Sequence, residues 1–222
     1  MLVRRWFLLA LFAVIFTQPV FPAEKVAPVE ARTPEQLAVE GLRRFWTNLQ
    51  TNKDGSVRLV RLSKPHVTLE ALAQLEQFPR LDYLAMVCPH LGDEALLYIR
   101  DLTNLDTLML SESAVGDSGL SCLQKLNKLE RLYLDNTKVT DAGLQHLSSL
   151  KQLKVLSLRN LNVTDQGMQT LADLNNLEVL FLSGTQVSDA GLKSLTELKQ
   201  LKILYLARTA ITGSQLSALN TL

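Results

Sequence analysis

The stretch Leu129–Gln152, LERLYLDNTKVTDAGLQHLSSLKQ, decides the fold of this chain, because related copies of it follow one another without a gap. Seven units of 24 residues cover residues 57–222, and the last unit is incomplete. A fixed period in the range of about 20 to 50 residues is typical of solenoid proteins. A stack of similar coils builds an extended surface more readily than a catalytic pocket. We number the residues of each unit 1 to 24 and call this number the phase.

Each unit has the apolar spacing of a short strand followed by a short helix. Phases 1, 4 and 6 carry leucine with few exceptions, and Leu132 and Leu134 show the two-residue alternation of a strand. Phases 16, 19 and 22 have helical spacing, as Leu144 and Leu147 show. Phase 11 is always a branched aliphatic residue, for example Val139. No unit buries its leucines alone, so we expect neighbouring units to stack around a continuous core.

The consensus LxxLxLxxTxVTDAGLxxLxxLxx resembles a leucine-rich repeat over residues 57–222. It is similar to the "DAGL" repeats of bacterial, notably planctomycete-type, exported proteins, and related repeats occur in cysteine-containing eukaryotic adaptor proteins. The resemblance implies an α/β leucine-rich-repeat solenoid. In this fold a curved parallel β-sheet forms the concave side and short helices form the convex side. The concave face is the usual ligand surface of the family.

The N-terminal residues differ in character from the repeats. Residues 1–23 combine Arg4 and Arg5 with an apolar run from Trp6 to Phe16, which predicts a secretory signal sequence. An uncleaved membrane anchor is the alternative, because Phe21 stands where a signal peptidase prefers a small residue. We therefore expect the mature chain to be exported to the periplasm, the cell envelope or the medium. Residues 24–32 are interpreted as a linker.

Residues 33–56 are predicted to form an N-terminal cap on the stack. Thr33-Pro34-Glu35 has the order of a helix N-cap, a proline at the first helical position and an acidic first turn. A helix from residue 34 to about 51 would place five apolar residues on one face. These residues are Leu37, Leu42, Phe45, Trp46 and Leu49. Residues 52–55, Asn-Lys-Asp-Gly, then predict a turn.

One aspartate recurs at phase 13, and a glycine follows it two residues later in most units. A row of stacked carboxylates suggests calcium, but no second acidic residue occurs at a neighbouring phase, and calcium needs about six to eight oxygen ligands. We interpret each aspartate as the N-cap of its own helix. The glycines predict positions where neighbouring coils approach closely. The aspartates are Asp93, Asp117, Asp141, Asp165 and Asp189.

Composition and motifs point away from nucleic acids, metals and catalysis. The formal net charge is +1 and basic residues are interleaved with acidic ones, so we expect no nucleic-acid partner. Cys88 and Cys122 fall at phases too far apart for a disulfide, and we expect both to be thiols. His66 and His90 share phase 10 and could converge with Cys88 on zinc, but no fourth ligand is evident. We predict no metal, no cofactor and no enzymatic activity, because no catalytic motif is present.

The turn after each predicted strand is not uniform. Many leucine-rich repeats place asparagine at phase 9, where this chain has serine or threonine in four units and Leu161 in another. Hydroxyl groups can satisfy backbone groups of the turn, but Leu161 and the prolines of the first two units cannot. We therefore expect an interrupted polar ladder and less regular turns in the first two units.

The concave face, at phases 2, 3, 5, 7 and 8, is the predicted binding surface for another protein. Tyrosine, phenylalanine, methionine and arginine are enriched at protein interfaces, although exposed strands also favour aromatic residues. The candidate ligand-binding residues are Tyr83, Met109, Arg131, Tyr133, Arg159, Phe181, Tyr205 and Arg208. The alternative function is self-assembly through the last coil. Nothing in the sequence covers the apolar residues of that coil, which include Leu204, Leu206, Ile211, Leu216 and Leu219.

Overall fold

The computed structural model describes residues 32–43, 45, 48–63 and 65–215. These residues all belong to one compact unit that begins at Arg32. The predicted signal sequence 1–23 lies outside the described residues, as does almost all of the linker 24–32. Trp46, Leu216 and Leu219 lie outside them as well.

Strands and short helices alternate along the chain in every coil. Several of the helical segments are 3₁₀ helices, labelled η. In chain order the elements are α1 (Pro34–Arg43), β1 (Asn48–Thr51), β2 (Val57–Leu62), α2 (Leu69–Ala73), η1 (Gln74–Gln77), β3 (Tyr83–Met86), α3 (Asp93–Leu96), β4 (Thr107–Met109), η2 (Gly119–Lys125), β5 (Arg131–Tyr133), α4 (Asp141–Leu144), η3 (Gln145–Ser149), β6 (Val155–Ser157), α5 (Asp165–Leu171), β7 (Val179–Phe181), α6 (Asp189–Leu195) and β8 (Ile203–Tyr205).

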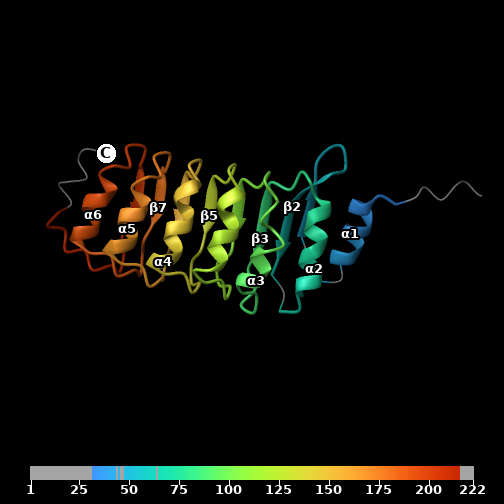
Figure 1. Ribbon diagram of the computed structural model, residues 1–222, viewed down its shortest axis with the longest axis horizontal. Helices are drawn as coiled ribbons and strands as arrows, with labels where there is room; N and C mark the ends of the chain where they lie inside the picture. Colours follow the sequence, from blue (N-terminus) through green and yellow to red (C-terminus); the bar gives the residue numbers. More distant parts are fainter. Residues whose placement is uncertain (1–31, 44, 46–47, 64, 216–222) are drawn as a thin grey trace, which may run out of the picture. The chain divides into compact units, whose positions relative to one another are not determined.

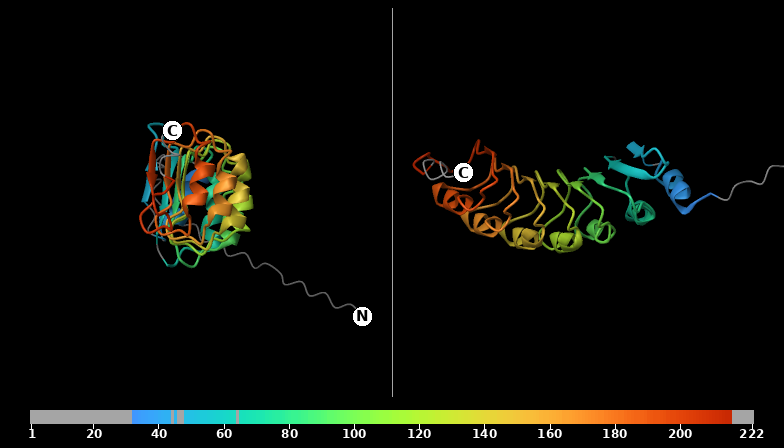
Figure 2. Two further views of the ribbon diagram at one scale, coloured as in Figure 1. Left: turned by 90° about the vertical axis from the view of Figure 1, so that its left-hand side faces the viewer. Right: turned by 90° about the horizontal axis from the view of Figure 1, so that it is seen from above.

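The strands form one open sheet whose spatial order is the order of the sequence, β1 to β8 (Figure 1). From β2 onward every pair is parallel, and paired residues differ by 24 positions, as Leu59 and Tyr83 do. The helices form one row on one side of the sheet, and the strands line the inner side of a shallow arc (Figure 2, right). The α/β leucine-rich-repeat solenoid predicted from the period is therefore confirmed, with its concave sheet and convex helices.

The leucines that repeat at fixed phases form the continuous core. In the fourth coil Leu132, Leu134, Leu144 and Leu147 are all completely buried, and Val139 at phase 11 is almost completely buried. Burying one such side chain contributes roughly 1.5–3 kcal/mol. Most of these contacts join one coil to the next, so each coil depends on its neighbours.

The N-terminal cap differs from its prediction, because its helix is shorter and a strand follows it. Helix α1 ends at Arg43, and β1 then pairs antiparallel with β2, so the expected helix to about residue 51 is wrong. The side chain of Leu37 is 54% exposed, whereas Leu42 is fully buried. The predicted start is correct: Thr33 Oγ1 accepts the Gln36 N–H at 3.2 Å, and Gln36 Oε1 accepts the Thr33 N–H. Strand β1 covers the edge that β2 would otherwise expose.

The phase 13 aspartates do not cap their own helices, which corrects the prediction. In the first coil and in the fourth to sixth coils a threonine or serine at phase 12 is the N-cap residue, as Thr164 is for α5. Asp141 instead reaches the following coil, where its Oδ1 accepts the Thr164 N–H at 2.9 Å and its Oδ2 accepts the Thr164 hydroxyl at 2.6 Å. The Thr164 hydroxyl also accepts the Gln166 N–H at 3.2 Å. Each carboxylate therefore fixes the helix start of the next coil against its own coil.

This contact recurs along the stack and we call it the aspartate ladder. Each of the aspartates Asp93, Asp117, Asp141, Asp165 and Asp189 accepts a backbone N–H and a hydroxyl from the coil that follows. At its C-terminal end, the hydrogen bond from the Thr212 hydroxyl lowers the pKa of Asp189. The carboxylates of the ladder are thus occupied by protein donors.

The two-residue spacing between aspartate and glycine, which recurs in most coils, follows from the same contact. A Cβ atom on Gly167 would collide with Asp141 Oδ1 of the preceding coil and lie 2.8 Å from Leu144 Cδ1. Gly119, Gly143 and Gly191 face the preceding aspartate in the same way. The prediction that these glycines mark close approach between coils is therefore confirmed.

The turns that follow the strands agree with their prediction from the second coil onward, whereas Lys64 in the first turn lies outside the described residues. The hydroxyl of Ser113 donates to the Leu110 carbonyl at 2.6 Å, and the threonines at phase 9 make the equivalent bond, as Thr185 does at 2.7 Å. Leu161 is buried at this phase and makes no such bond. The residue at phase 8 has a positive φ in the third to seventh coils. Cys88, which has this phase in the second coil, does not. The second coil therefore turns differently from those that follow it.

Alanine substitutions at two glycines distinguish the effect of close packing between coils from the effect of helix propensity. We expect Gly167→Ala to lower the free energy of unfolding by about 1–3 kcal/mol, because the new methyl group displaces Asp141 or Leu144. Gly41→Ala is the matched control in α1, where the nearest atom would be Gln74 Cγ at 3.9 Å. Alanine there should stabilise the protein by roughly 0.5–1 kcal/mol. Urea unfolding of both variants measures the difference, and equal effects would contradict the packing argument.

Candidate functional site

The parallel register lines up side chains of equal phase across the concave face. Phases 3 and 5 both point away from the helices, because the leucine at phase 4 between them points into the core. At phase 5 the register places Met109 beside Tyr133 and Phe181 beside Tyr205, with Ser157 between the two pairs. The predicted residues Met109, Tyr133, Phe181 and Tyr205 therefore belong to one column.

Three predicted residues form a compact cluster near the C-terminal end of the sheet. The rings of Phe181 and Tyr205 are stacked, with centroids 4.5 Å apart and an interplanar angle of 8°. The guanidinium carbon of Arg159 lies 4.0 Å from the Phe181 centroid and 5.9 Å from the Tyr205 centroid. Tyr205 is 46% exposed, and its neighbour Ile203 is equally exposed. An exposed stack of rings crossed by a cation offers both apolar area and charge to a partner.

A carboxylate beneath this cluster holds the arginine in place. Asp135 Oδ1 accepts the Arg159 backbone N–H at 3.0 Å and also accepts the hydroxyl of the fully buried Ser157. Asp135 Oδ2 lies 3.9 Å from Arg159 Nη1. Asp135 thus contacts both the backbone and the guanidinium of Arg159, which lies over the rings. We call Arg159, Phe181, Tyr205 and their support Asp135 the aromatic cluster.

The remaining predicted residues lie elsewhere on the face or at its edge. The Tyr83 hydroxyl lies 2.7 Å from Met109 Sδ, and Arg61 lies over the Tyr83 ring at 5.1 Å. Arg131 pairs with Asp106 at 3.4 Å. Arg208 is exposed in the turn after β8, where its φ is 56°. The structure therefore joins Arg159 with the two rings and Tyr83 with Met109, but it leaves Arg131 and Arg208 apart from both groups.

Asp135, Ser157 and Ile203 occupy the phases predicted for the concave face, but they were not among the candidate ligand-binding residues. The signal for Asp135 and Ser157 was available, because phase 7 of one coil lies next to phases 5 and 7 of the following coil. Ile203 shares phase 3 with the predicted Tyr83 and Arg131.

The residues considered for zinc do not form a ligand set. Cys88 is fully buried, and its Sγ lies 3.4 Å from the Leu62 carbonyl oxygen. His90 Nε2 lies 2.6 Å from the Val67 carbonyl oxygen, while His66 is exposed. Within the described residues, no group of three or more histidine, cysteine or acidic side chains could hold a metal ion. Cys88 and Cys122 are not joined by a disulfide, as predicted.

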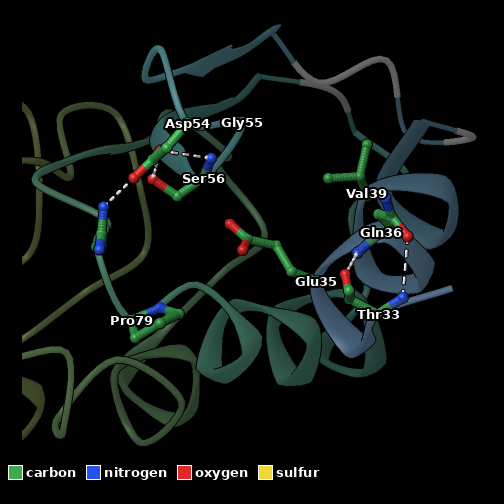
Figure 3. A pocket seen from close by; sticks show the side chains of 9 residues that line it. Thr33, Glu35, Gln36, Val39, Asp54, Gly55, Ser56 and Pro79 are labelled. Atoms are coloured by element: carbon green, nitrogen blue, oxygen red, sulfur yellow. Dashed lines mark hydrogen bonds and ion pairs between the residues drawn. The ribbon is translucent and has the colours of Figure 1, made fainter.

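A polar cleft of about 400 Å³ lies between α1 and the turn that joins β1 to β2 (Figure 3). Its charged groups are already engaged in holding the cap. Glu35 Oε1 accepts the Val57 N–H at 2.5 Å, and Asp54 pairs with Arg80. Hydrogen bonds from Ser56, together with the charge of Arg80, lower the pKa of Asp54. We interpret this cleft as the attachment of the N-terminal helix to the first coil.

Comparisons with known proteins identify the repeat and the fold. A family model described as "Leucine Rich repeat" matches residues 173–195. An internalin (InlF) from Listeria monocytogenes str. 4b F2365 has a TM-score of 0.58 and 24% identity, covering 68% of this chain. Internalin C2 from the same strain has a TM-score of 0.61 and 22% identity, covering 84% of this chain and 89% of its own. A search of the curated proteins gave no match.

A third similar structure is that of PEPR1–AtPEP1, with a TM-score of 0.53 and 24% identity over 78% of this chain. The present chain spans 42% of the InlF chain and 24% of the PEPR1–AtPEP1 chain. At these identities the likeness shows the shared fold. Among residues 32–215, as far as they are described, no helix has the length and apolar character needed to cross a bilayer.

Proposed function

Because this chain is a leucine-rich-repeat protein, we propose that it binds another protein through its concave face and catalyses no reaction. The aromatic cluster is the observation that carries this proposal. Aromatic and arginine side chains dominate the energy of many protein interfaces, and here two stacked rings on neighbouring strands lie against Arg159. The similar PEPR1 structure contains AtPEP1, which agrees with a binding role for such a surface.

We further propose that residues 1–23 direct export, so that the partner is met in the periplasm, at the cell envelope or outside the cell. The basic residues, the apolar run and the following Pro-Ala support this proposal. The resemblance of the repeats to the exported bacterial "DAGL" type supports it as well. A membrane contact would arise only if residues 1–23 remained attached as an anchor.

A capture experiment with matched variants tests the binding face. Purified protein on beads is incubated with envelope extract, and captured proteins are quantified by mass spectrometry. We expect the double variant I203S/Y205S to lose at least about tenfold of the specific partner, because it removes exposed area at the aromatic cluster. The control L97S/Y98S removes exposed apolar area on the convex side, where Leu97 is 52% exposed, and should retain the partner.

Two results would contradict this proposal. One is equal loss in the control, and the other is full capture by the I203S/Y205S protein. The charge-reversal variant R131E/R159E is also expected to lose capture. Arg159 crosses the stacked rings and Arg131 lies on the same face.

Self-assembly through the last coil is the second candidate function, and the edge of the sheet supports it. Among the described residues β8 pairs with β7 alone, whereas β1 covers the opposite edge. Ile203 and Tyr205 are exposed on this edge strand, and exposed apolar edge strands invite pairing with another chain. In this arrangement copies would associate end to end.

Sedimentation velocity over a range of protein concentrations tests self-assembly. The proposal predicts reversible oligomers that Ile203→Lys abolishes, because a charge at the edge opposes pairing. R131E/R159E should still associate, which separates self-assembly from partner binding. A protein that stays monomeric at every concentration would rule out this candidate.

A further inference from the structure

The residue at phase 8 has a left-handed backbone in five successive coils. The residues are Glu112, Asn136, Asn160, Gly184 and Arg208, with φ between 56° and 78°. Glycine and asparagine adopt this conformation most readily, and three of the five coils use them. Glu112 and Arg208 are the exceptions. A residue that is locally unfavourable and exposed suggests a role outside the packing of its own turn.

The side chains between these two exceptions are small and engaged with each other. Asn160 Nδ2 donates to Asn136 Oδ1 at 2.9 Å, and Asn160 also fills the space where Gly184 would carry a Cβ. Glu112 and Arg208 are both exposed, and neither forms an ion pair with another described residue. The edge of the concave face therefore carries an unpaired anion at one end and an unpaired cation at the other.

Between the second and the seventh coil, the charges on the concave face have the same polarity, whereas the first coil adds the basic residues Arg58 and Arg61. In the second to fourth coils, phases 2, 3, 5, 7 and 8 carry five acidic residues and one basic residue, Arg131. In the fifth to seventh coils the same phases carry four basic residues and one acidic residue, Glu178. Several of these charges pair with one another, as Lys154 does with Glu130 and Lys202 does with Glu178, so Glu112 and Arg208 are the charges of this set that remain open to a partner. A partner with the opposite polarity would be attracted in one orientation and opposed in the other.

The spacing of the coils defines the length of such a partner. Four coil steps separate Glu112 from Arg208, and neighbouring strands lie about 4.8 Å apart, which gives about 19 Å. An extended peptide advances about 3.3 Å per residue, so about six residues span this distance. Side chains at positions 1, 5 and 7 of such a peptide point to the same side. Position 5 lies about 13 Å along the peptide, next to the sixth coil, which carries Phe181 at about 14 Å.

We propose that the concave face binds an extended peptide segment of its protein partner in one defined direction. A basic residue of the peptide pairs with Glu112, and an acidic residue about six positions later pairs with Arg208. An aromatic or large apolar residue two positions before the acidic one packs on the Phe181–Tyr205 stack. This proposal rests on the proposed binding function and specifies its ligand.

Two sets of synthetic peptides test the direction. The first set has lysine at position 1, an aromatic residue at position 5 and glutamate at position 7, with the other positions varied. The second set exchanges the lysine and the glutamate. Fluorescence anisotropy with labelled peptides measures binding to the full chain at low and physiological salt. We expect the first set to bind on the order of tenfold more tightly, with a preference that weakens as salt rises.

Variants at phase 8 identify the residues responsible without disturbing the turn. E112R/R208E exchanges the two residue types already found in this backbone conformation, and it should reverse the preference between the sets. E112N/R208N introduces asparagine, which the fourth and fifth coils already have at this phase, and it should abolish the preference. The melting temperature of E112N/R208N should equal or exceed that of the wild type, which shows that the fold is intact.

The peptide experiment and the capture experiment can fail independently, so failure of the directed-peptide proposal is distinguishable from failure of the proposed binding function. Equal binding of both sets, or a preference that the exchange variant does not reverse, would overturn the directed-peptide proposal. Failure of both sets to bind would overturn it as well. The capture experiment with I203S/Y205S tests partner binding independently, so a partner could still be captured if the peptide proposal failed.

Discussion

The carboxylate at phase 13 is the polar contact that joins each coil from the second to the sixth to the coil that follows it. Apolar burial and the parallel pairing of the strands hold the coils together on the sheet side. Asp141 adds a contact at the start of the helices, because it accepts both the backbone N–H and the hydroxyl of Thr164 in the following coil. Thr164 in turn caps its own helix. Helix start and coil register are thus set by the same pair of residues, and the glycine of the next coil leaves room for the carboxylate.

This fixed register is what gives the concave face its pattern. Because every strand pair from β2 to β8 is offset by 24 residues, one position per coil forms a column across the sheet. Phe181 stacks on Tyr205 because these two residues are partners in the register of β7 and β8. Arg159 crosses both rings because Asp135, one coil earlier, holds its backbone. The arrangement of the proposed binding surface is therefore a consequence of coil packing. Its chemistry depends on the residues at phases 2, 3, 5, 7 and 8, which vary from coil to coil.

The sequence predicted the regular features and failed where a contact crosses between coils. Leucine periodicity was sufficient for the solenoid, its core and its concave face. The extent of α1 was overestimated, because Leu49 fits a helical stripe as well as it fits the strand that pairs with β2. Asp141 was predicted to cap its own helix. In a single repeat, an aspartate that caps its own helix and one that contacts a residue 23 positions later leave the same sequence pattern. The supporting role of Asp135 was not predicted for the same reason, because its partners Ser157 and Arg159 are in the following coil.

A double-mutant cycle on Asp165 and Gly191 tests the aspartate ladder most directly, with urea unfolding as the measurement. A Cβ on Gly191 would collide with Asp165 Oδ1 and lie 3.0 Å from Val187 Cγ1, whose side chain can yield. D165A and G191A should each cost about 1–3 kcal/mol. The double variant should cost at least about 1 kcal/mol less than the sum, because alanine at 165 vacates the space that the new methyl group needs. Additive costs, within about 0.3 kcal/mol, would contradict the account that the carboxylate and the glycine form one contact.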